Sequence, residues 1–313
     1  MVLDDLPITY VGTPDLEAAI DTYTNELSLG YRLEMIKPAD HPSEAWLTNG
    51  KNRVCIKERR ISVRSKKGGV HRAAPPVIEG EWHTGRAGME YRDLIPGRLG
   101  GKVIASHIRL TQDGEVPDYV HYHKVKFQMI YCLRGRIRVV YEDQGPPFWL
   151  EPGDCVLQPP EIRHRVLEST GHAEVVEIGM PAVHETWVEH EMELPTSEIK
   201  PDRDFSGQRF VRHIASEADW IASETQGLES RDTGISKATS GLANVFISRT
   251  NLGGVSGQCI QFDRYVFFFV TSGNLEIATH DGDNRILNPG EASVIHPNID
   301  YKCKFAANTV VLE

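Results

Sequence analysis

Short apolar runs separated by glycine and proline turns dominate the chain from about residue 100 onward, and they limit the folds open to it. Such runs cover 103–110, 127–133, 137–141, 155–158 and 173–178. Turn sequences such as Gln112-Asp113-Gly114 and Glu151-Pro152-Gly153 lie between them. Many short strands with tight turns and no long helical pattern are typical of a β-sandwich or β-barrel. A similar series follows at 245–248, 258–262, 265–270, 275–279 and 292–296, so we expect two β units in tandem.

The first 60 residues follow a different pattern, in which one strand and one helix precede further strands. Residues 8–11 read as a strand, and Thr13-Pro14-Asp15 predicts a helix start with a capping residue and then proline at the first helical position. Apolar residues recur at helical spacing over 16–27, and Gly30 ends the helix. Strand-like stretches follow at 31–36, 45–47 and 54–56. We therefore expect a small α+β unit.

Two polar, turn-rich segments divide the chain. Residues 61–84 hold the basic pair Lys66-Lys67, glycines and prolines, and residues 185–205 are acidic and contain Pro195 and Pro201. Both compositions are typical of linkers. The predicted units are therefore a small module at 1–60, a first β unit at 85–184 and a second β unit at 206–313.

Composition excludes several classes of partner. The 313 residues carry 34 Lys and Arg against 44 Asp and Glu, a formal net charge of −10, which disfavours sequence-independent binding to nucleic acid or anionic lipid. The five cysteines are widely spaced without a CxxC pair, which indicates reduced thiols. The N-terminus does not resemble a signal peptide, and no apolar run approaches the roughly 20 residues of a membrane span. We expect a cytoplasmic protein with no nucleic-acid or membrane partner.

Three histidines have the spacing of a metal site. His121 and His123 stand two residues apart, so in a strand they project from the same face. His164 follows the turn at Gly153 and can reach that face from another strand. Imidazole suits Zn, Cu, Fe and Ni, and three imidazoles leave positions open for substrate or oxygen. The alternative is a polar core cluster without metal.

The residues around the first two histidines resemble the first motif of the cupin family. That motif runs Gly, five residues, His-x-His, three or four residues, Glu, six residues, Gly. Here six residues separate Gly114 from His121. His123 is followed by four residues, then by Gln128 in place of Glu, and after six more residues by Gly135 at an expected hairpin turn.

The segment around the third histidine resembles the second cupin motif. That motif runs Gly, five residues, Pro-x-Gly, two residues, His, three residues, Asn. Gly153, Pro159 and His164 fit this spacing, while Glu161 replaces the glycine and Glu168 replaces the asparagine. The joint spacing of both motifs is far more specific than a single His-x-His.

This resemblance implies a mainly β fold of two tandem cupin barrels (double-stranded β-helices) after a small α+β βαβββ module. It also implies that His121, His123 and His164 hold a divalent metal, with Fe(II) favoured and Zn, Mn or Ni as alternatives. Gln128 either completes a loosely held ligand set or hydrogen-bonds a bound water or substrate oxygen. Because this shell is neutral, the metal keeps its full positive charge, which favours an anionic, chelating substrate.

The third segment resembles a second cupin that has lost its ligands. Gly273 and Gly290 stand where the first barrel has Gly135 and Gly153. The ligand positions then become Cys259, Gln261, Val266 and Tyr301. We expect a barrel without metal that packs against the first barrel or forms an oligomer surface.

The first segment resembles a single module of the vicinal-oxygen-chelate superfamily. The match rests on Ile8-Thr9-Tyr10-Val11, on 14–19 and on Gly30-Tyr31-Arg32-Leu33. Metal sites of that superfamily draw ligands from two modules. Only one module is present here, and its first ligand position falls near Tyr10, so we expect a structural or dimerisation role.

Three further residues are candidates for substrate contact. His107 lies on the strand before the first motif, and that strand can line the barrel mouth. Ile130 and Cys132 share the face of Gln128 by strand alternation, so they can wall the same pocket. Core packing is the equal alternative for these two residues.

The leading functional hypothesis is a non-haem Fe(II) dioxygenase that acts on a small chelating substrate, such as a hydroxylated aromatic acid or a β-diketone, together with O₂. A second hypothesis is a non-oxidative isomerase or lyase that uses Zn, Mn or Ni. A third is a non-catalytic protein that binds a small molecule. A homodimer is the expected assembly.

Overall fold

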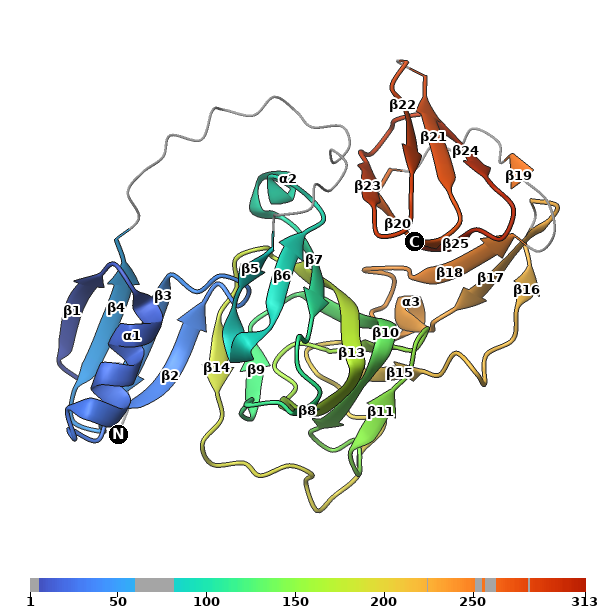
Figure 1. Ribbon diagram of the computed structural model, residues 1–313. Coiled ribbons are helices and arrows are strands. Elements are labelled where there is room, and N and C mark those ends of the chain that lie inside the picture. Colours follow the sequence, from blue (N-terminus) through green and yellow to red (C-terminus); the bar gives the residue numbers. More distant parts are fainter. Residues whose placement is uncertain (1–5, 60–81, 224, 251–254, 257–262, 281) are drawn as a thin grey trace.

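The computed structural model describes residues 6–59, 82–223, 225–250, 255–256, 263–280 and 282–313. Within these residues the protein is mainly β and consists of a small α+β module, a central barrel and a C-terminal β-sandwich (Figure 1). This architecture confirms the predicted fold class. No helix in the described part of the chain combines the length and apolarity needed to cross a membrane.

The N-terminal module has the predicted order of strand, helix and three strands. Its elements are β1 Ile8–Thr13, α1 Leu16–Asp21, a π-helical turn Thr22–Glu26, β2 Arg32–Lys37, β3 Glu44–Thr48 and β4 Arg53–Glu58. The predicted helix start at Thr13-Pro14 is wrong. The N-cap is Asp15, whose carboxylate accepts a hydrogen bond of 3.0 Å from the Ala18 N–H, as aspartate commonly does at this position.

The central barrel is built around two long antiparallel strands. Its strands are β5 His83–Thr84, β6 Glu90–Asp93, β7 Ile104–Arg109, β8 Gly114–Glu115, β9 His121–His123, β10 Phe127–Tyr141, β11 Phe148–Leu150, β12 Cys155–Leu157 and β13 His164–Met180. Helical turns cover Arg86–Gly88 and Arg98–Gly101, the latter labelled α2. β10 and β13 pair from Phe127–Met180 at one end to Tyr141–His164 at the other. This pairing brings the beginning of β13 to the end of β10.

The hairpin turn expected at Gly135 does not form. β10 runs through this position, and its register with β13 shifts on both sides of Arg134. Gly135 has φ of 61°, and a Cβ here would lie 2.6 Å from the Thr170 oxygen and 2.8 Å from the Ala173 Cα. The glycine is therefore required by a β-bulge and a close backbone approach rather than by a turn.

The segment predicted as a linker at 185–205 begins with a strand. β14 (Thr186–Val188) pairs with β9 on one side and with β2 on the other. The N-terminal sheet is therefore continuous with the sheet of the central barrel. Three residues in a polar segment give almost no periodic signal, which is why the sequence did not reveal this strand. The residues 61–81 of the other predicted linker lie outside the described part of the chain.

β15 (Val211–His213) joins the central sheet beside β12. The C-terminal unit follows, and its described residues form a six-stranded and a four-stranded sheet. Its elements are β16 Ile221–Ala222, β17 Leu228–Asp232, α3 Ile235–Ala238, β18 Phe246–Thr250, β19 Val255–Ser256, β20 Val266–Ser272, β21 Leu275–Thr279, β22 Asn284–Leu287, β23 Ala292–Ile295, β24 Tyr301–Phe305 and β25 Val310–Leu312. The expected strand at 258–262, with Cys259 and Gln261, lies outside the described residues.

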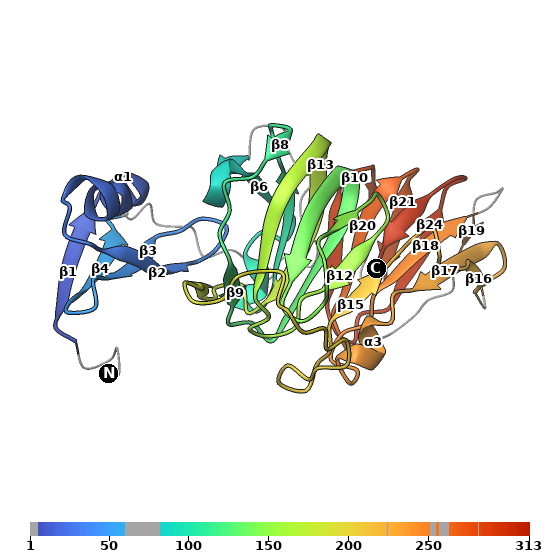
Figure 2. The ribbon, with the colours of Figure 1, turned by 90° about the horizontal axis from the view of Figure 1, so that it is seen from below.

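An apolar layer joins the two β units. Met129, Leu157 and Val176 of the central barrel share one buried cluster with Phe269 and Leu312 of the C-terminal unit. Figure 2 shows the strands of the two units stacked side by side. One face of the central sheet is thus covered, and the interior of the central barrel on its other side holds the candidate site.

Candidate metal centre

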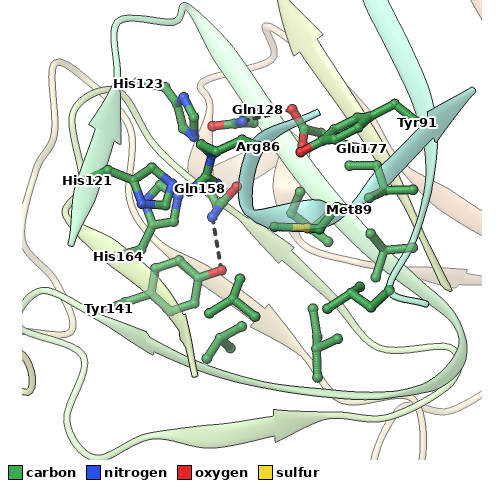
Figure 3. Close-up of a pocket in the computed structure, with 17 residues that line it drawn as sticks. Arg86, Met89, Tyr91, His121, His123, Gln128, Tyr141, Gln158, His164 and Glu177 are labelled. Atoms are coloured by element: carbon green, nitrogen blue, oxygen red, sulfur yellow. Dashed lines mark hydrogen bonds between the residues drawn. The ribbon is translucent and has the colours of Figure 1, made fainter. Parts of the chain in front are cut away.

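The three predicted histidines meet inside the central barrel. His121 and His123 both point inward from β9, and His164 begins β13 directly opposite His121 in the strand register. One ring nitrogen from each lies within 4.8 Å of the others, and the side chains are buried (Figure 3). Among the described residues, this is the group of His, Cys, Asp and Glu side chains whose geometry suits a metal ion.

Each histidine has its Nδ1 atom engaged on the side away from this meeting point. The Nδ1 partners are the Tyr119 oxygen at 2.8 Å for His121, the Thr186 Oγ1 at 2.8 Å for His123 and the Ile162 oxygen at 2.9 Å for His164. A proton on Nδ1 leaves a lone pair on Nε2. The Nε2 of His121 is buried without a hydrogen-bond partner among the described residues. A divalent metal satisfies this orphaned atom, so the residues fit the ion.

Burial keeps the three rings neutral. It is the main cause that lowers the pKa of His164 to about 4, and it lowers the pKa of His121 and His123 well below the ordinary value. The positive charge of Arg86 also lowers the pKa of these rings. Neutral imidazole is the form that binds metal, so the site is in its metal-binding state at neutral pH.

In the metal-free protein we expect the free energy of unfolding to fall as the pH falls below 6.5. His164 takes up a proton near pH 6.5 in the unfolded chain but only near pH 4 in the fold, so acid in this window favours unfolding. This one residue lowers the free energy of unfolding by about 2 kcal/mol between pH 7.5 and pH 5. Urea titrations at both pH values measure the effect. If the His164→Gln variant lost the same free energy of unfolding between these pH values, His164 would not be the source of the effect.

Gln128 lies beside the histidines, held by a second polar side chain. Its side chain is buried, and its Nε2 donates a hydrogen bond of 3.0 Å to Oε1 of Glu177. The amide nitrogen is thus engaged, and the amide oxygen is the atom that can bind a metal, a water or a substrate. Both roles predicted for Gln128 stay predictions. Burial raises the pKa of Glu177.

The histidines open onto a cavity of about 60 Å³ with a polar and an apolar end. The polar lining comes from the three histidines and from Arg86, Tyr91, Gln128, Tyr141, Gln158 and Glu177. The apolar lining is aliphatic and includes Ile108, Ile130 and Val175. A ligand that fits this cavity has a polar head at the histidines and a short hydrocarbon part.

Of the three predicted substrate contacts, the structure places Ile130 on the cavity wall. Cys132 lies further along the same strand face, in the core, where its Sγ contacts the Leu150 oxygen at 3.5 Å. It is not among the residues that line the cavity.

His107 faces away from the cavity. Its Nε2 donates to Glu174 at 2.9 Å, its Nδ1 accepts from Arg92 at 2.8 Å, and its ring packs on Phe269 of the C-terminal unit. The strand alternation was correct, but Ile108 rather than His107 points inward. His107 therefore joins the two β units and does not line the described cavity.

Sequence reasoning missed five polar residues of the cavity, which are Arg86, Tyr91, Tyr141, Gln158 and Glu177. Arg86 lies in the turn Arg86–Gly88 and forms an ion pair with the buried Asp118. No local pattern marks it. Tyr141 and Gln158 line the cavity near His164. Tyr141 shares the inward face of Ile137 and Val139, but the register shifts around Arg134 reverse the alternation that begins at Gln128, so counting along the strand from Gln128 would place Tyr141 on the outer face.

Thr186 connects a predicted metal ligand to the N-terminal module. Its Oγ1 accepts from Nδ1 of His123, and its backbone pairs with Ile36 of β2. We expect Thr186→Val to lower metal affinity about 10- to 100-fold, because valine keeps the shape but loses the oxygen that orients the ring. Competition with a chromophoric chelator for Zn(II) measures the change. Thr186→Ser should bind as the unchanged protein does, and equal weakening by both substitutions would show a packing effect instead.

The other two units contain no such group of ligands in their described residues. In the C-terminal unit, Tyr301 is buried against Phe268 at 5.9 Å between ring centroids, and Val266 offers no donor atom. In the N-terminal module, Tyr10 is 69% exposed on the edge strand β1.

Known proteins share this fold. Residues 107–179 match the family model Cupin_2, the cupin domain. This part of the chain, which carries the three histidines, is therefore similar to the cupin domain. Solved structures with a similar fold include oxalate decarboxylase from Bacillus subtilis at pH 4.6, with a TM-score of 0.53 and 13% identity over 74% of this chain and 73% of that chain.

Salicylate 1,2-dioxygenase from Pseudaminobacter salicylatoxidans is also similar, with a TM-score of 0.54 and 16% identity over 71% of this chain and 74% of that chain. At these identities the likeness shows the fold alone. No curated protein matches this chain. Together with the histidine cluster, the cupin domain supports binding of a divalent metal.

Proposed function

We propose that this protein is a non-haem Fe(II) dioxygenase that acts on a small chelating acid. The observation that carries the proposal is that three neutral imidazoles and Arg86 line one buried cavity. The imidazoles add no negative charge, so a bound ion keeps its attraction for anionic oxygens. A guanidinium group is well suited to hold a carboxylate beside that ion.

The size of the cavity favours a short aliphatic substrate. At about 60 Å³ it is less than half of the roughly 150 Å³ cavity that accommodates benzene. Short aliphatic chelating acids therefore fit better than a hydroxylated aromatic acid, and they also carry the carboxylate that Arg86 can hold. The aliphatic wall would hold the hydrocarbon part and exclude water.

Each residue of the cavity would have a separate role. His121, His123 and His164 would hold the metal through Nε2, and Gln128 would either join them or hydrogen-bond a water or substrate oxygen. Iron, when bound, supplies a Lewis acid and the electrons needed for reaction with O₂. Arg86 would orient the carboxylate of the substrate. A dioxygenase reaction needs no separate reductant, because both atoms of O₂ enter the product.

Glu177 favours a second candidate function. Its carboxyl group lines the same cavity and lies beside Gln128. A carboxyl group in this place can move a proton to or from a bound enolate, the step that an isomerase or lyase needs. Such an enzyme would use Zn, Mn or Ni and would consume no oxygen.

Metal analysis of anaerobically purified protein, followed by oxygen-electrode assays, separates these functions. The panel contains short 2-oxo and 2-hydroxy acids, β-diketones and hydroxylated aromatic acids. We expect uptake of one O₂ per substrate by iron-loaded protein and no uptake by zinc-loaded protein. Turnover without O₂ uptake would support the isomerase or lyase. Retained metal without turnover of any compound would contradict both and support a small-molecule-binding protein.

A further inference from the structure

Gln158 carries a polar atom that the protein itself does not use. Its side chain is 4% exposed and lines the cavity beside the histidines. Its Nε2 donates a hydrogen bond of 3.1 Å to the hydroxyl of Tyr141. Its Oε1 is buried without a hydrogen-bond partner among the described residues. A buried carbonyl oxygen left in this state costs stability, and because Gln158 lines the cavity, a ligand bound there can complete it.

Tyr141 supplies the complementary atom. Its ring is buried and stacks on His164, with ring centroids 5.7 Å apart and an angle of 23°. Its oxygen accepts the bond from Gln158, so its own proton is left to donate. A phenol hydroxyl both donates and accepts hydrogen bonds, so Tyr141 can still act as a donor. The pair thus presents one acceptor, Gln158 Oε1, and one donor, the Tyr141 hydroxyl.

Both side chains are held in place before any ligand arrives. The Gln158 backbone N–H donates to the Gln128 oxygen at 2.9 Å, and Tyr141 is paired with His164 in the β10–β13 register. Figure 3 shows Gln158 between the histidines and the Tyr141 hydroxyl, with its amide oxygen turned away from that hydroxyl. The pair therefore lies at the polar end of the cavity, within the space that the head of a substrate would occupy.

We propose that Gln158 and Tyr141 form a recognition site for a substrate hydroxyl group. This hydroxyl donates to Gln158 Oε1 and accepts from Tyr141, and it is additional to the chelating oxygens at the metal and to the carboxylate at Arg86. A hydroxyl is the smallest group that both donates and accepts. The inference rests on the proposed function and narrows its substrate to short acids that carry a further hydroxyl, such as dihydroxy acids.

Two acids that differ by one hydroxyl test this site. Lactate and glycerate share the carboxylate and the 2-hydroxyl, and only glycerate has a hydroxyl on C3. Calorimetric titration of zinc-loaded protein measures binding without any turnover. We expect the protein to bind glycerate at least about tenfold more tightly than lactate, as two satisfied buried groups predict. In the Gln158→Met and Tyr141→Phe variants, the ratio of the affinity for glycerate to the affinity for lactate should fall toward one.

Gln208 offers a matched control. It is a buried glutamine whose Oε1 also lacks a partner among the described residues, and it does not line the cavity. Gln208→Met should keep the preference for glycerate. Equal binding of the two acids by the unchanged protein, or an undiminished preference in Tyr141→Phe, overturns the hydroxyl site alone. Failure of both acids to bind the metal-loaded protein also overturns the hydroxyl site, whereas the proposed function is decided separately by oxygen uptake on the wider panel.

Discussion

Replacing His164 by alanine should lower the affinity for divalent metal by more than about 100-fold. Loss of a residue that only orients a ligand already costs about 10- to 100-fold, so loss of a ligand should cost more. His164 offers Nε2 to the site while its Nδ1 is fixed on the Ile162 oxygen. Two imidazoles that remain on β9 cannot surround the ion in the same way.

Metal content per chain after dialysis against a chelator measures this effect. His280→Ala is the matched control, because His280 is an exposed histidine of the C-terminal unit and should leave the metal content unchanged. Circular dichroism shows whether His164→Ala keeps the β fold. A folded His164→Ala protein that retains a full complement of metal would exclude His164 as a ligand.

Replacing Arg86 by methionine should have two separable effects. It should weaken binding of a chelating acid about 100-fold, because a buried cation that faces the carboxylate is lost. It should also destabilise the fold by about 3–5 kcal/mol, because Asp118 would remain buried without its counter-charge. Metal affinity should not fall, since Arg86 is not a ligand and its removal takes a positive charge away from the three histidines.

The double variant Arg86→Met, Asp118→Asn separates the two effects. Neutralising Asp118 removes the unpaired charge, so part of the stability in urea should return while acid binding stays weak. The asparagine side chain would also keep an oxygen for the Val166 N–H, which donates to Asp118 Oδ2 at 3.0 Å in the unchanged protein. Acid binding that recovers together with stability would show that Arg86 supports the fold and does not recognise substrate.

Strand alternation predicted which residues share a face, but it did not decide which face is inside. His121 and His123 were placed together by their spacing, and Ile130 was placed beside Gln128 in the same way. The same argument gave the wrong face for His107, because both faces of β7 are buried. One face lines the cavity and the other packs on the C-terminal unit, and alternation along one strand cannot distinguish these two environments.

Gly135 likewise shows what the sequence predicted and what the tertiary contacts decided. The motif spacing marked Gly135 as special, and the residue does have a left-handed backbone. Glycine is required at position 135 because β13 passes close to the bulge, where the Thr170 oxygen leaves no room for a Cβ. A contact with a strand more than 30 residues later along the chain is not visible in the local sequence.

The sequence by itself determined a β-rich chain and the three histidines that can hold a metal, because strand periodicity and ligand spacing are local properties. Only the tertiary structure brought Arg86, Tyr141, Gln158 and Thr186 to those histidines. These residues come from separate strands and turns, and their meeting depends on which strands pair and in which register. The acid and hydroxyl contacts proposed here rest on that pairing.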